Sequence, residues 1–263
     1  MSPHPATIEP DRPAEFTDMR PTGQVAVVTG AASGIGAAVV HRLLARGMTV
    51  IGCDVVSMPS TGAVHQQLHP RRLDVSDSRA VRATVHAVLG RWGRVDVLAN
   101  VAGIHDGFSA AHSMTDELWD RVLDVDLTGP LRMARAVLPS MIERRSGSIV
   151  NVASVAGLSG SISGAAYTAA KHGLIGLTRS IASMYRQYDI RCNAVCPGSV
   201  TTRLAEGDAV RDPWGFEHLR GRLSRPERQA RADEIASLVA YLASEEASFV
   251  SGSIVGADGA WLA

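Results

Sequence analysis

The sequence predicts a single α/β domain, in which a doubly wound parallel sheet carries helices on both faces. Short apolar runs alternate with amphipathic segments of helical length along most of the 263 residues. A glycine-rich turn follows the first apolar run and opens the first helical segment. No internal repeat or change of composition divides residues 23–263, so we expect one domain with right-handed crossovers.

Composition and charge narrow the class of protein. Apolar residues make up 46% of the chain, enough for a sizeable core, and 26 basic residues balance 26 acidic ones. We therefore expect neither nucleic acid nor a membrane as a partner. No apolar run reaches membrane-spanning length, and no N-terminal segment has the pattern of a signal peptide. The three cysteines lack metal-ligand spacing, so we expect no metal site and reduced thiols in a cytoplasmic protein.

The N-terminal segment differs from the rest of the chain. Residues 1–22 hold five of the twelve prolines and little apolar periodicity, which predicts a flexible tail. Residues 24–29 (QVAVVT) then have the pattern of a buried strand. A helix should run from the glycine-rich turn to Arg46, where Gly47 ends it. Residues 50–54 predict the second strand.

The turn between the first strand and this helix reads TGAASGIG over residues 29–36. Strand, glycine-rich turn, helix and strand form the dinucleotide-binding unit, in which the pyrophosphate lies at the helix N-terminus. Such a turn can also serve tight packing alone, but its place between a strand and a helix favours a nucleotide.

Asp54 ends the second strand, 18 residues after Gly36. A carboxylate here accepts hydrogen bonds from the ribose hydroxyls and repels a 2′-phosphate. No arginine or lysine lies within residues 29–36 or directly after Asp54. The sequence therefore favours NAD over NADP, the alternative being a plain turn residue at the end of a strand.

The remaining elements alternate in the same way. Residues 55–72 contain two prolines and a glycine and little helical pattern, which predicts a short irregular crossover. After it we expect a short strand at or ending at 73–75, a helix over 78–92, a strand over 94–101, a helix from 115 through 138, a strand over 148–152, a helix over 165–185, a strand over 190–195, an irregular segment over 203–226, a helix over 233–243 and a strand over 253–255.

Lys171 is the only lysine of the chain and follows Tyr167 by four residues. Positions i and i+4 lie on one face of a helix, so the ammonium and the phenol can share a site. Taken alone, a chance surface lysine in an arginine-rich composition would explain the pair as well.

Further motifs decide between these interpretations. Asp74 follows the third strand, NVAG lies at 100–103, Ser154 follows the fifth strand, YTAAK lies at 167–171 and PGSVTT at 197–202. With these motifs the chain resembles the single-domain short-chain dehydrogenases/reductases over about residues 23–263. The resemblance implies a Rossmann-like fold with about seven parallel strands, and a homotetramer.

The resemblance also assigns cofactor-binding roles, although Gly103, Pro197 and Gly198 could be turn residues only. It implies that the pyrophosphate lies on the turn at Gly30, Ser33, Gly34, Ile35 and Gly36, the adenosine ribose at Asp54, the adenine at Asp74 and Val75, the central part of the cofactor at Asn100, Ala102 and Gly103, and the nicotinamide at Pro197, Gly198, Val200 and Thr202.

The chemistry can be argued from the residue types. Oxidation of a carbinol releases a hydride and a proton, and a base must accept the proton near neutral pH. An unperturbed tyrosine titrates near pH 10, about three units or about 4 kcal/mol too high, and a neighbouring ammonium lowers that value. We therefore assign Tyr167 as the acid/base, Lys171 as the residue that lowers its pKa and binds the nicotinamide ribose, and Ser154 as donor to the substrate oxygen. The alternative for Ser154 is a plain capping serine.

One position departs from the family. The pattern V-N-L-x-G reads VDLTG over residues 125–129, so Asp126 stands where the family has asparagine. One hypothesis is that its charge stabilises the ammonium of Lys171 but opposes phenolate formation, slowing the reaction or moving its optimum to higher pH. The other is that Asp126 stays protonated and acts like asparagine. A solvent-facing Asp126 without a role is the third alternative.

We expect an NAD-dependent oxidoreductase of a secondary alcohol or ketone, with a cyclic alcohol or diol as one option. One alternative function is a 3-oxoacyl-thioester reductase, but Asp54 argues against the NADPH that it would need. Another is a weakly active NAD-binding regulatory protein, and Asp126 is the only feature that favours it. Residues 203–226 correspond to the substrate loop of the family. Candidate pocket residues are Trp214, Phe216, Leu219, Leu223, His105, Asp106, Phe108 and residues 158–162.

Overall fold

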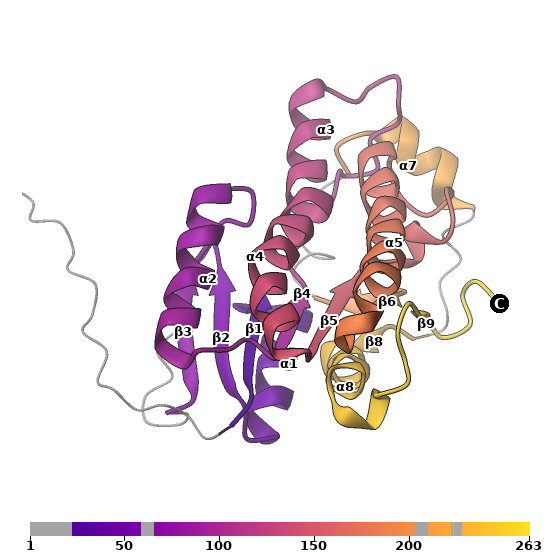
Figure 1. Ribbon diagram of the computed structural model, residues 1–263. Helices are drawn as coiled ribbons and strands as arrows, with labels where there is room; N and C mark the ends of the chain where they lie inside the picture. Colours follow the sequence, from indigo (N-terminus) through magenta and orange to yellow (C-terminus); the bar gives the residue numbers. More distant parts are fainter. Residues whose placement is uncertain (1–22, 59–65, 203–209, 222, 224–227) are drawn as a thin grey trace, which may run out of the picture.

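A computed structural model describes residues 23–58, 66–202, 210–221, 223 and 228–263 (Figure 1). Seven parallel strands form one sheet in the order β3-β2-β1-β4-β5-β6-β9. The strands are β1 Val25–Thr29, β2 Thr49–Asp54, β3 Leu68–Arg72, β4 Val97–Asn100, β5 Gly147–Val152, β6 Ile190–Pro197 and β9 Ile254–Ala257. A short parallel pair, β7 Val200–Thr201 and β8 Ala230–Arg231, lies apart from it.

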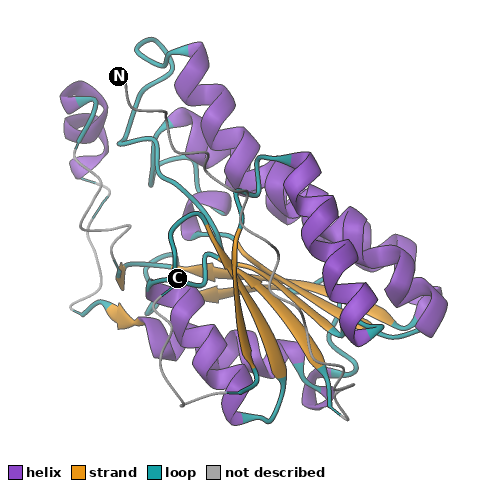
Figure 2. Ribbon diagram, turned by 90° about the vertical axis from the view of Figure 1, so that its left-hand side faces the viewer, coloured by secondary structure: helices purple, strands orange, loops and turns teal. Residues whose placement is uncertain are grey.

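Helices cover both faces of the sheet, as Figure 2 shows. They are α1 Gly34–Ala45, α2 Ser78–Trp92, α3 Asp116–Leu123, α4 Gly129–Arg144, α5 Ala165–Tyr185, α7 Pro213–Arg220 and α8 Ala232–Ala243. Short 3₁₀ turns lie at Val155–Gly157, Arg186–Tyr188 and Glu245–Ala247. The predicted α/β class, the Rossmann-like doubly wound sheet and its seven strands are confirmed.

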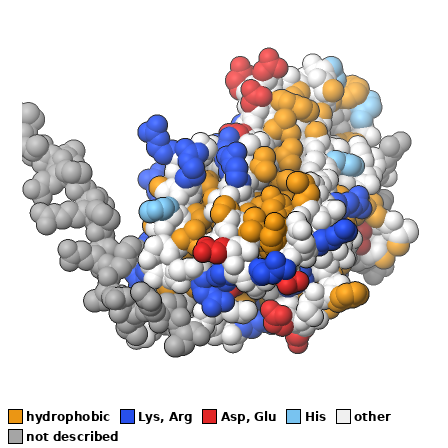
Figure 3. Space-filling model, in the orientation of Figure 1, with side chains coloured by type: hydrophobic (Ala, Val, Ile, Leu, Met, Phe, Trp, Pro, Cys, Tyr) orange, Lys and Arg blue, Asp and Glu red, His pale blue; other side chains and the backbone are white. Residues whose placement is uncertain are grey.

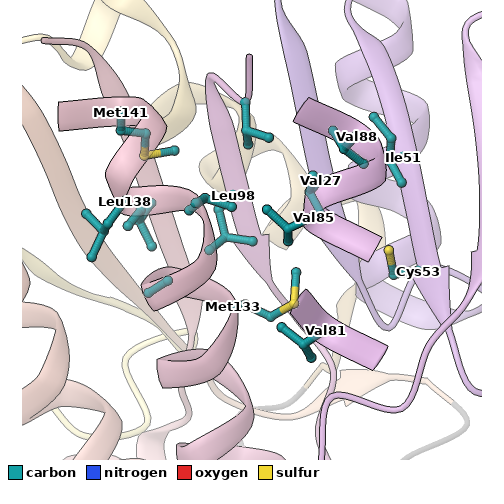
Figure 4. Packing of buried hydrophobic residues seen from close by; sticks show 14 of the residues in the cluster. Val27, Ile51, Cys53, Val81, Val85, Val88, Leu98, Met133, Leu138 and Met141 are labelled. Carbon is teal, nitrogen blue, oxygen red and sulfur yellow. The ribbon is translucent and has the colours of Figure 1, made fainter. Parts of the chain in front are cut away.

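Two apolar clusters hold the layers together. On one face, α2, α4 and α5 pack against the sheet through residues such as Val85 and Met133, both buried (Figure 4). On the other face, α1 and α8 do the same through residues such as Leu43 and Val239. The carboxyl ends of all seven strands therefore meet at one edge of the sheet, where open α/β folds place their ligands.

The last part of the segment 55–72, which was predicted to be an irregular crossover, is a strand. Strand β3 occupies Leu68–Arg72, and residues 73–75 come after it rather than within it. Pro70 lies opposite Gly52 in this strand. Because β3 is the outermost strand of the sheet, the missing N–H of proline is tolerated there. Residues 59–65 lie outside the described part of the chain.

Two further elements differ from expectation. The helix predicted from 115 continues past Pro139 to Arg144, and a π-helical turn over Asp124–Thr128 interrupts it. The segment expected to be irregular contains α7, whose first turn is capped by Asp212 and begins with Pro213. An aspartate before a proline is a helix-start signal that the sequence offered. Residues 203–209, 222 and 224–227 lie outside the described residues.

Candidate active site

A cavity of about 540 Å³ lies at the carboxyl edge of the sheet. Its wall is formed by the glycine-rich turn, the ends of β2 and β3, the segments after β4, β5 and β6, and parts of α5 and α7. The predicted residues that line it are Gly30, Ser33, Gly34, Ile35, Gly36, Asp54, Asp74, Val75, Ala102, Gly103, Ser154, Tyr167, Lys171, Pro197, Gly198, Val200 and Thr202. Residues spread over 170 positions of the sequence therefore share one cavity.

Two predicted residues stand behind this wall. Asn100 is buried, and its amide nitrogen donates to the Asn151 side chain (2.8 Å), which links β4 to β5. Asp126 is fully buried and contacts two cavity-lining residues, Lys171 and Ile104. The described residues contain no group of side chains with the composition of a metal site.

The turn after β1 has the geometry that an anionic group requires. Gly30 has a φ of +67°, and a Cβ there would lie 2.8 Å from the backbone nitrogen of Ala102. A Cβ on Gly36 would lie 1.9 Å from the Gly30 carbonyl oxygen. Ser33 makes no side-chain cap at α1, and no acidic residue occupies the first turn of that helix. The helix N-terminus can therefore receive a pyrophosphate.

Asp54 lies at the cavity edge with its carboxylate held by backbone groups. Its oxygens accept hydrogen bonds from the N–H of Ala32 (2.9 Å) and of Val56 (3.1 Å). Arg72 is its neighbour on β3 in the strand register and donates from Nε to the Val55 carbonyl oxygen (3.2 Å). Arg72 is not adjacent to Asp54 in the sequence, so only the register of β2 and β3 reveals that the two residues are neighbours.

Asp74 follows the end of β3 and also lines the cavity. It accepts hydrogen bonds from the backbone N–H (2.9 Å) and hydroxyl (2.6 Å) of Ser76, and Arg121 lies 3.3 Å away. Burial alone would raise the pKa of Asp74, but these hydrogen bonds and the guanidinium lower it overall. The charged form of the carboxylate is therefore favoured at the place where the family resemblance puts the adenine ring.

Ser154, Tyr167 and Lys171 meet where β5 and α5 border the cavity. Ser154 follows β5, and its Oγ accepts the N–H of Ala156 (3.1 Å), so this serine is a cap that also lines the cavity. Tyr167 and Lys171 lie one turn apart on α5, and Nζ of Lys171 is 5.3 Å from the centre of the phenol ring. A hydroxyl, a phenol and an ammonium therefore face one space.

Lys171 and Asp126 form a buried ion pair with Nζ and Oδ2 3.0 Å apart. The ammonium also donates to the Val152 carbonyl oxygen (3.2 Å), and Asp126 Oδ1 accepts the N–H of Ile104 (2.8 Å). Burial raises the pKa of Asp126, although the neighbouring ammonium acts against this. Burial would lower the pKa of Lys171, but the charge of Asp126 raises it overall. The alternative of a solvent-facing Asp126 is wrong.

The structure adds a residue whose role the sequence did not show. Asp106 is fully buried and accepts the backbone N–H groups of Tyr167 (3.0 Å) and Phe108 (3.2 Å). Gly164 precedes α5 and has no side chain to cap it, and a Cβ there would lie 2.4 Å from the Asp106 carboxylate. Asp106 therefore caps helix α5 from another segment, a contact that no local pattern reveals.

The candidate pocket residues divide in two groups. His105, Phe108, Ile162, Phe216 and Leu223 line the cavity. Leu158 and Trp214 are largely exposed. Trp214 and Leu219 line a separate cavity of about 230 Å³ beneath α7, and Ser163 and Phe108 border both cavities. Ser163 was not among the predicted residues.

Comparisons with known proteins give a consistent result. The family model described as short chain dehydrogenase matches residues 24–211. The chain is 39% identical to the short-chain dehydrogenase/reductase cdmF of Talaromyces verruculosus over 247 residues, which is 90% of this chain and 96% of that protein. Levodione reductase superimposes with a TM-score of 0.81 and 36% identity, covering 93% and 98% of the two chains. Aldohexose dehydrogenase of Thermoplasma acidophilum superimposes with a TM-score of 0.78 and 34% identity, covering 91% of this chain and 94% of that chain.

Proposed function

Because the chain belongs to the short-chain dehydrogenase family of oxidoreductases, we propose that it interconverts a secondary alcohol and a ketone with NAD. The observation that carries the proposal is the meeting of Ser154, Tyr167 and Lys171 in the cavity that the glycine-rich turn also lines. Two solved relatives are named as a dehydrogenase of an aldohexose and a reductase of levodione, which supports chemistry between a carbinol and a carbonyl.

In this proposal the three polar side chains have different tasks. The phenolate of Tyr167 accepts the proton of the carbinol oxygen, and Ser154 donates a hydrogen bond to the same oxygen, where charge develops. Lys171 favours the phenolate electrostatically and binds the ribose next to the nicotinamide. NAD, when bound, supplies the acceptor for the hydride. The apolar side chains of Phe216 and Leu223 exclude water from the reacting atoms.

The experiment that tests this is nicotinamide absorbance during incubation with NAD and a panel of secondary alcohols and diols. Tyr167→Phe should lower turnover by about 10²- to 10⁴-fold, because it removes the proton acceptor. Tyr241→Phe, a substitution of the same kind on the exposed side of α8, is the control. Turnover by Tyr167→Phe at the wild-type rate would contradict the proposal.

The preference for NAD rests on Asp54, whose carboxylate would face a 2′-phosphate. Removing it in Asp54→Ser should raise kcat/KM for NADP relative to NAD by about tenfold or more, because a like-charge contact is relieved and Arg72 remains nearby. Asp120→Ser, on the exposed face of α3, should leave the ratio unchanged. A wild-type enzyme that prefers NADP would overturn this part of the proposal.

We also propose a homotetramer in a reducing compartment such as the cytoplasm. Apolar side chains gather on the face formed by α4 and α5 (Figure 3), where Leu131 and Met184 are exposed, and Phe249 is fully exposed. All three cysteines are buried free thiols. No helix in the described part of the chain is long and apolar enough to cross a membrane. Light scattering should give about four times the chain mass.

A second candidate is a weakly active, NAD-binding regulatory protein. The Asp126–Lys171 ion pair favours it, because the carboxylate opposes phenolate formation beside the ammonium. The pH–rate comparison described below distinguishes the two candidates. A 3-oxoacyl-thioester reductase would require the NADPH preference that Asp54 opposes.

A further inference from the structure

His105 and Ser163 form a hydrogen-bonded pair in the cavity wall next to Tyr167. The two rings of His105 and Tyr167 lie 4.8 Å apart between centres, and His105 Nε2 lies 2.7 Å from Ser163 Oγ. Nδ1 of His105 accepts the backbone N–H of Gly107 (3.0 Å). A ring nitrogen that accepts carries no hydrogen, so this hydrogen bond assigns the ring hydrogen to Nε2.

The direction of this hydrogen bond orients Ser163. Because Nε2–H donates to Oγ, the serine hydroxyl must point its own hydrogen away from the imidazole. Within the described part of the chain, the His105 ring is the one hydrogen-bonding partner of this oxygen. Ser163 lines the cavity, so its hydroxyl is a donor that can be directed at a ligand.

The imidazole is held firmly in this arrangement. Its ring packs 4.9 Å from the ring of Phe108, and its side chain is only 12% exposed. Phe108 in turn packs 5.2 Å from Phe216 of α7. A side chain with this many contacts has little freedom, so Ser163 keeps one orientation without loss of entropy on ligand binding.

Much of the cavity wall around the pair is apolar, and the fully buried carboxylate of Asp106 lies 3.9 Å from Nδ1 of His105. Ile104, Phe108, Ile162, Phe216 and Trp261 line the same cavity. A buried donor among such side chains costs free energy unless it is satisfied. Besides Lys171, the charged side chains of the described cavity wall are Asp54, Asp74 and Arg121, which come from the ends of β2 and β3 and from α3. The partner of Ser163 should therefore be an uncharged oxygen.

We propose that Ser163, oriented by His105, binds a second oxygen of the substrate, close to the carbinol that Tyr167 deprotonates. The substrate class is then a neutral diol or hydroxyketone rather than an alcohol with one hydroxyl. Ser163 is a substrate-binding residue and His105 a positioning residue. This inference rests on the proposed dehydrogenase activity, and it adds the feature of the substrate that the site recognises.

The test compares matched alcohols in the full-length protein with NAD. The pairs are trans-cyclohexane-1,2-diol with cyclohexanol, and butane-2,3-diol with butan-2-ol. The quantity measured is the ratio of kcat/KM for the diol to that for the monohydric alcohol, corrected for the number of hydroxyls. We expect a wild-type ratio of about ten or more, because a site with a buried donor discriminates against a ligand without the partner.

Substitutions of Ser163 and His105 test whether these two residues cause the preference for the diol. Ser163→Ala should lower it about tenfold by removing the donor. His105→Phe keeps the ring packing and removes Nε2–H, so it should also lower the ratio, which a purely structural role of the ring would leave unchanged. Ser161→Ala is the matched control, because that hydroxyl bonds to Ser159 (3.0 Å) and does not line the cavity.

A binding measurement keeps the inference separate from catalysis. In the complex of Tyr167→Phe with NADH, cofactor fluorescence reports binding of 2-hydroxycyclohexanone and of cyclohexanone. Tighter binding of the hydroxyketone, lost on adding Ser163→Ala, supports the inference even without turnover. Equal binding of the two ketones, or a wild-type ratio near one, overturns it. Absence of turnover with every alcohol, together with selective binding, would count against the dehydrogenase activity and not against the site.

Discussion

At the scale of the residue, the buried pair of Asp126 and Lys171 controls the charge beside the proposed base. The carboxylate lies 3.0 Å from the ammonium and is fully buried. Burial alone would lower the pKa of Lys171, but the charge of Asp126 raises it overall and so favours the ammonium. The same negative charge opposes a second negative charge on Tyr167. On the first hypothesis for Asp126, the pair therefore favours the phenolate less than a lysine beside asparagine would.

Asp126→Asn tests this charge effect. Removing the carboxylate should favour the phenolate at lower pH, so the rise of kcat/KM with pH for alcohol oxidation should move down by about one pH unit. The measurement is a pH–rate profile of the variant beside wild type. Asp124→Asn is the matched control, because Asp124 lies in the same π-helical turn but pairs with Arg132.

The two hypotheses for Asp126 predict different profiles. Burial raises the pKa of Asp126, and a carboxyl group that stayed protonated would act as asparagine does. Superimposable profiles of wild type and Asp126→Asn would therefore reject the charge effect. Turnover by the variant alone would identify the natural chain as the weakly active regulatory protein.

At the scale of the element, the start of helix α5 depends on a residue outside it. Asp106 lies in the segment after β4 and accepts the N–H of Tyr167 (3.0 Å). The backbone carbonyl of Gly107, in the same segment, accepts the N–H groups of Arg211 and Asp212 ahead of α7. Asp212 returns the contact by accepting the N–H of Ala110 (2.9 Å). The segment after β4 thus joins α5 to α7.

Asp106→Ala should loosen the first turn of α5 and with it the position of Tyr167. We expect a loss of about 1–3 kcal/mol in the free energy of unfolding, because two backbone N–H groups lose their acceptor. We also expect a lower kcat with little change in NADH binding. Urea unfolding, turnover and cofactor fluorescence measure the three quantities.

The control for this variant is Asp116→Ala, which removes an exposed carboxylate in the first turn of α3. Asp106→Asn keeps an oxygen that can accept one of the two N–H groups, so it should restore part of the stability. An Asp106→Ala variant with wild-type stability and turnover would show that α5 needs no remote cap.

At the scale of the whole molecule, Asp96 connects the sheet to a helix far from the active site. Its carboxylate accepts hydrogen bonds from the N–H of Val25 in β1 (2.8 Å), from Arg94 (2.7 Å) and from Arg144 of α4 (2.8 Å). Burial alone would raise the pKa of Asp96, but the bonds from these three residues lower it overall. The charged form is therefore favoured in the folded protein.

Stability should follow the titration of Asp96. A group whose pKa is lower in the folded state stabilises the protein above its unfolded pKa of about 3.9, and this contribution is lost as the pH falls through the folded value. Asp96→Asn should therefore cost about 1–3 kcal/mol at pH 7 and progressively less below about pH 4. Urea unfolding at pH 7 and below about pH 4 measures the loss of stability at each pH, with the exposed substitution Asp120→Asn as the control. A difference independent of pH would contradict the role of the charge.

Much of the fold and of the site was predictable because the deciding features are local. The alternation of apolar runs with helical segments reflects which faces must be buried, and every motif except YTAAK follows or ends a strand of the sheet. The spacing of four residues places Tyr167 and Lys171 on one helix face, and the order of the other motifs identifies the two residues as part of a site. The third strand was predicted but placed too late in the chain, because Pro70 breaks the usual pattern and is tolerated in β3 only at the edge of the sheet.

Contacts between distant segments were decided by the tertiary structure. The π-helical turn aims Asp126 at Lys171, the register of β2 and β3 places Arg72 beside Asp54, and the course of the segment after β4 brings Asp106 and His105 to the start of α5. Periodicity and spacing record only what a residue's neighbours in the chain require. A partner tens of residues away depends on how whole elements pack, because their side chains meet only after the sheet and its helices have assembled.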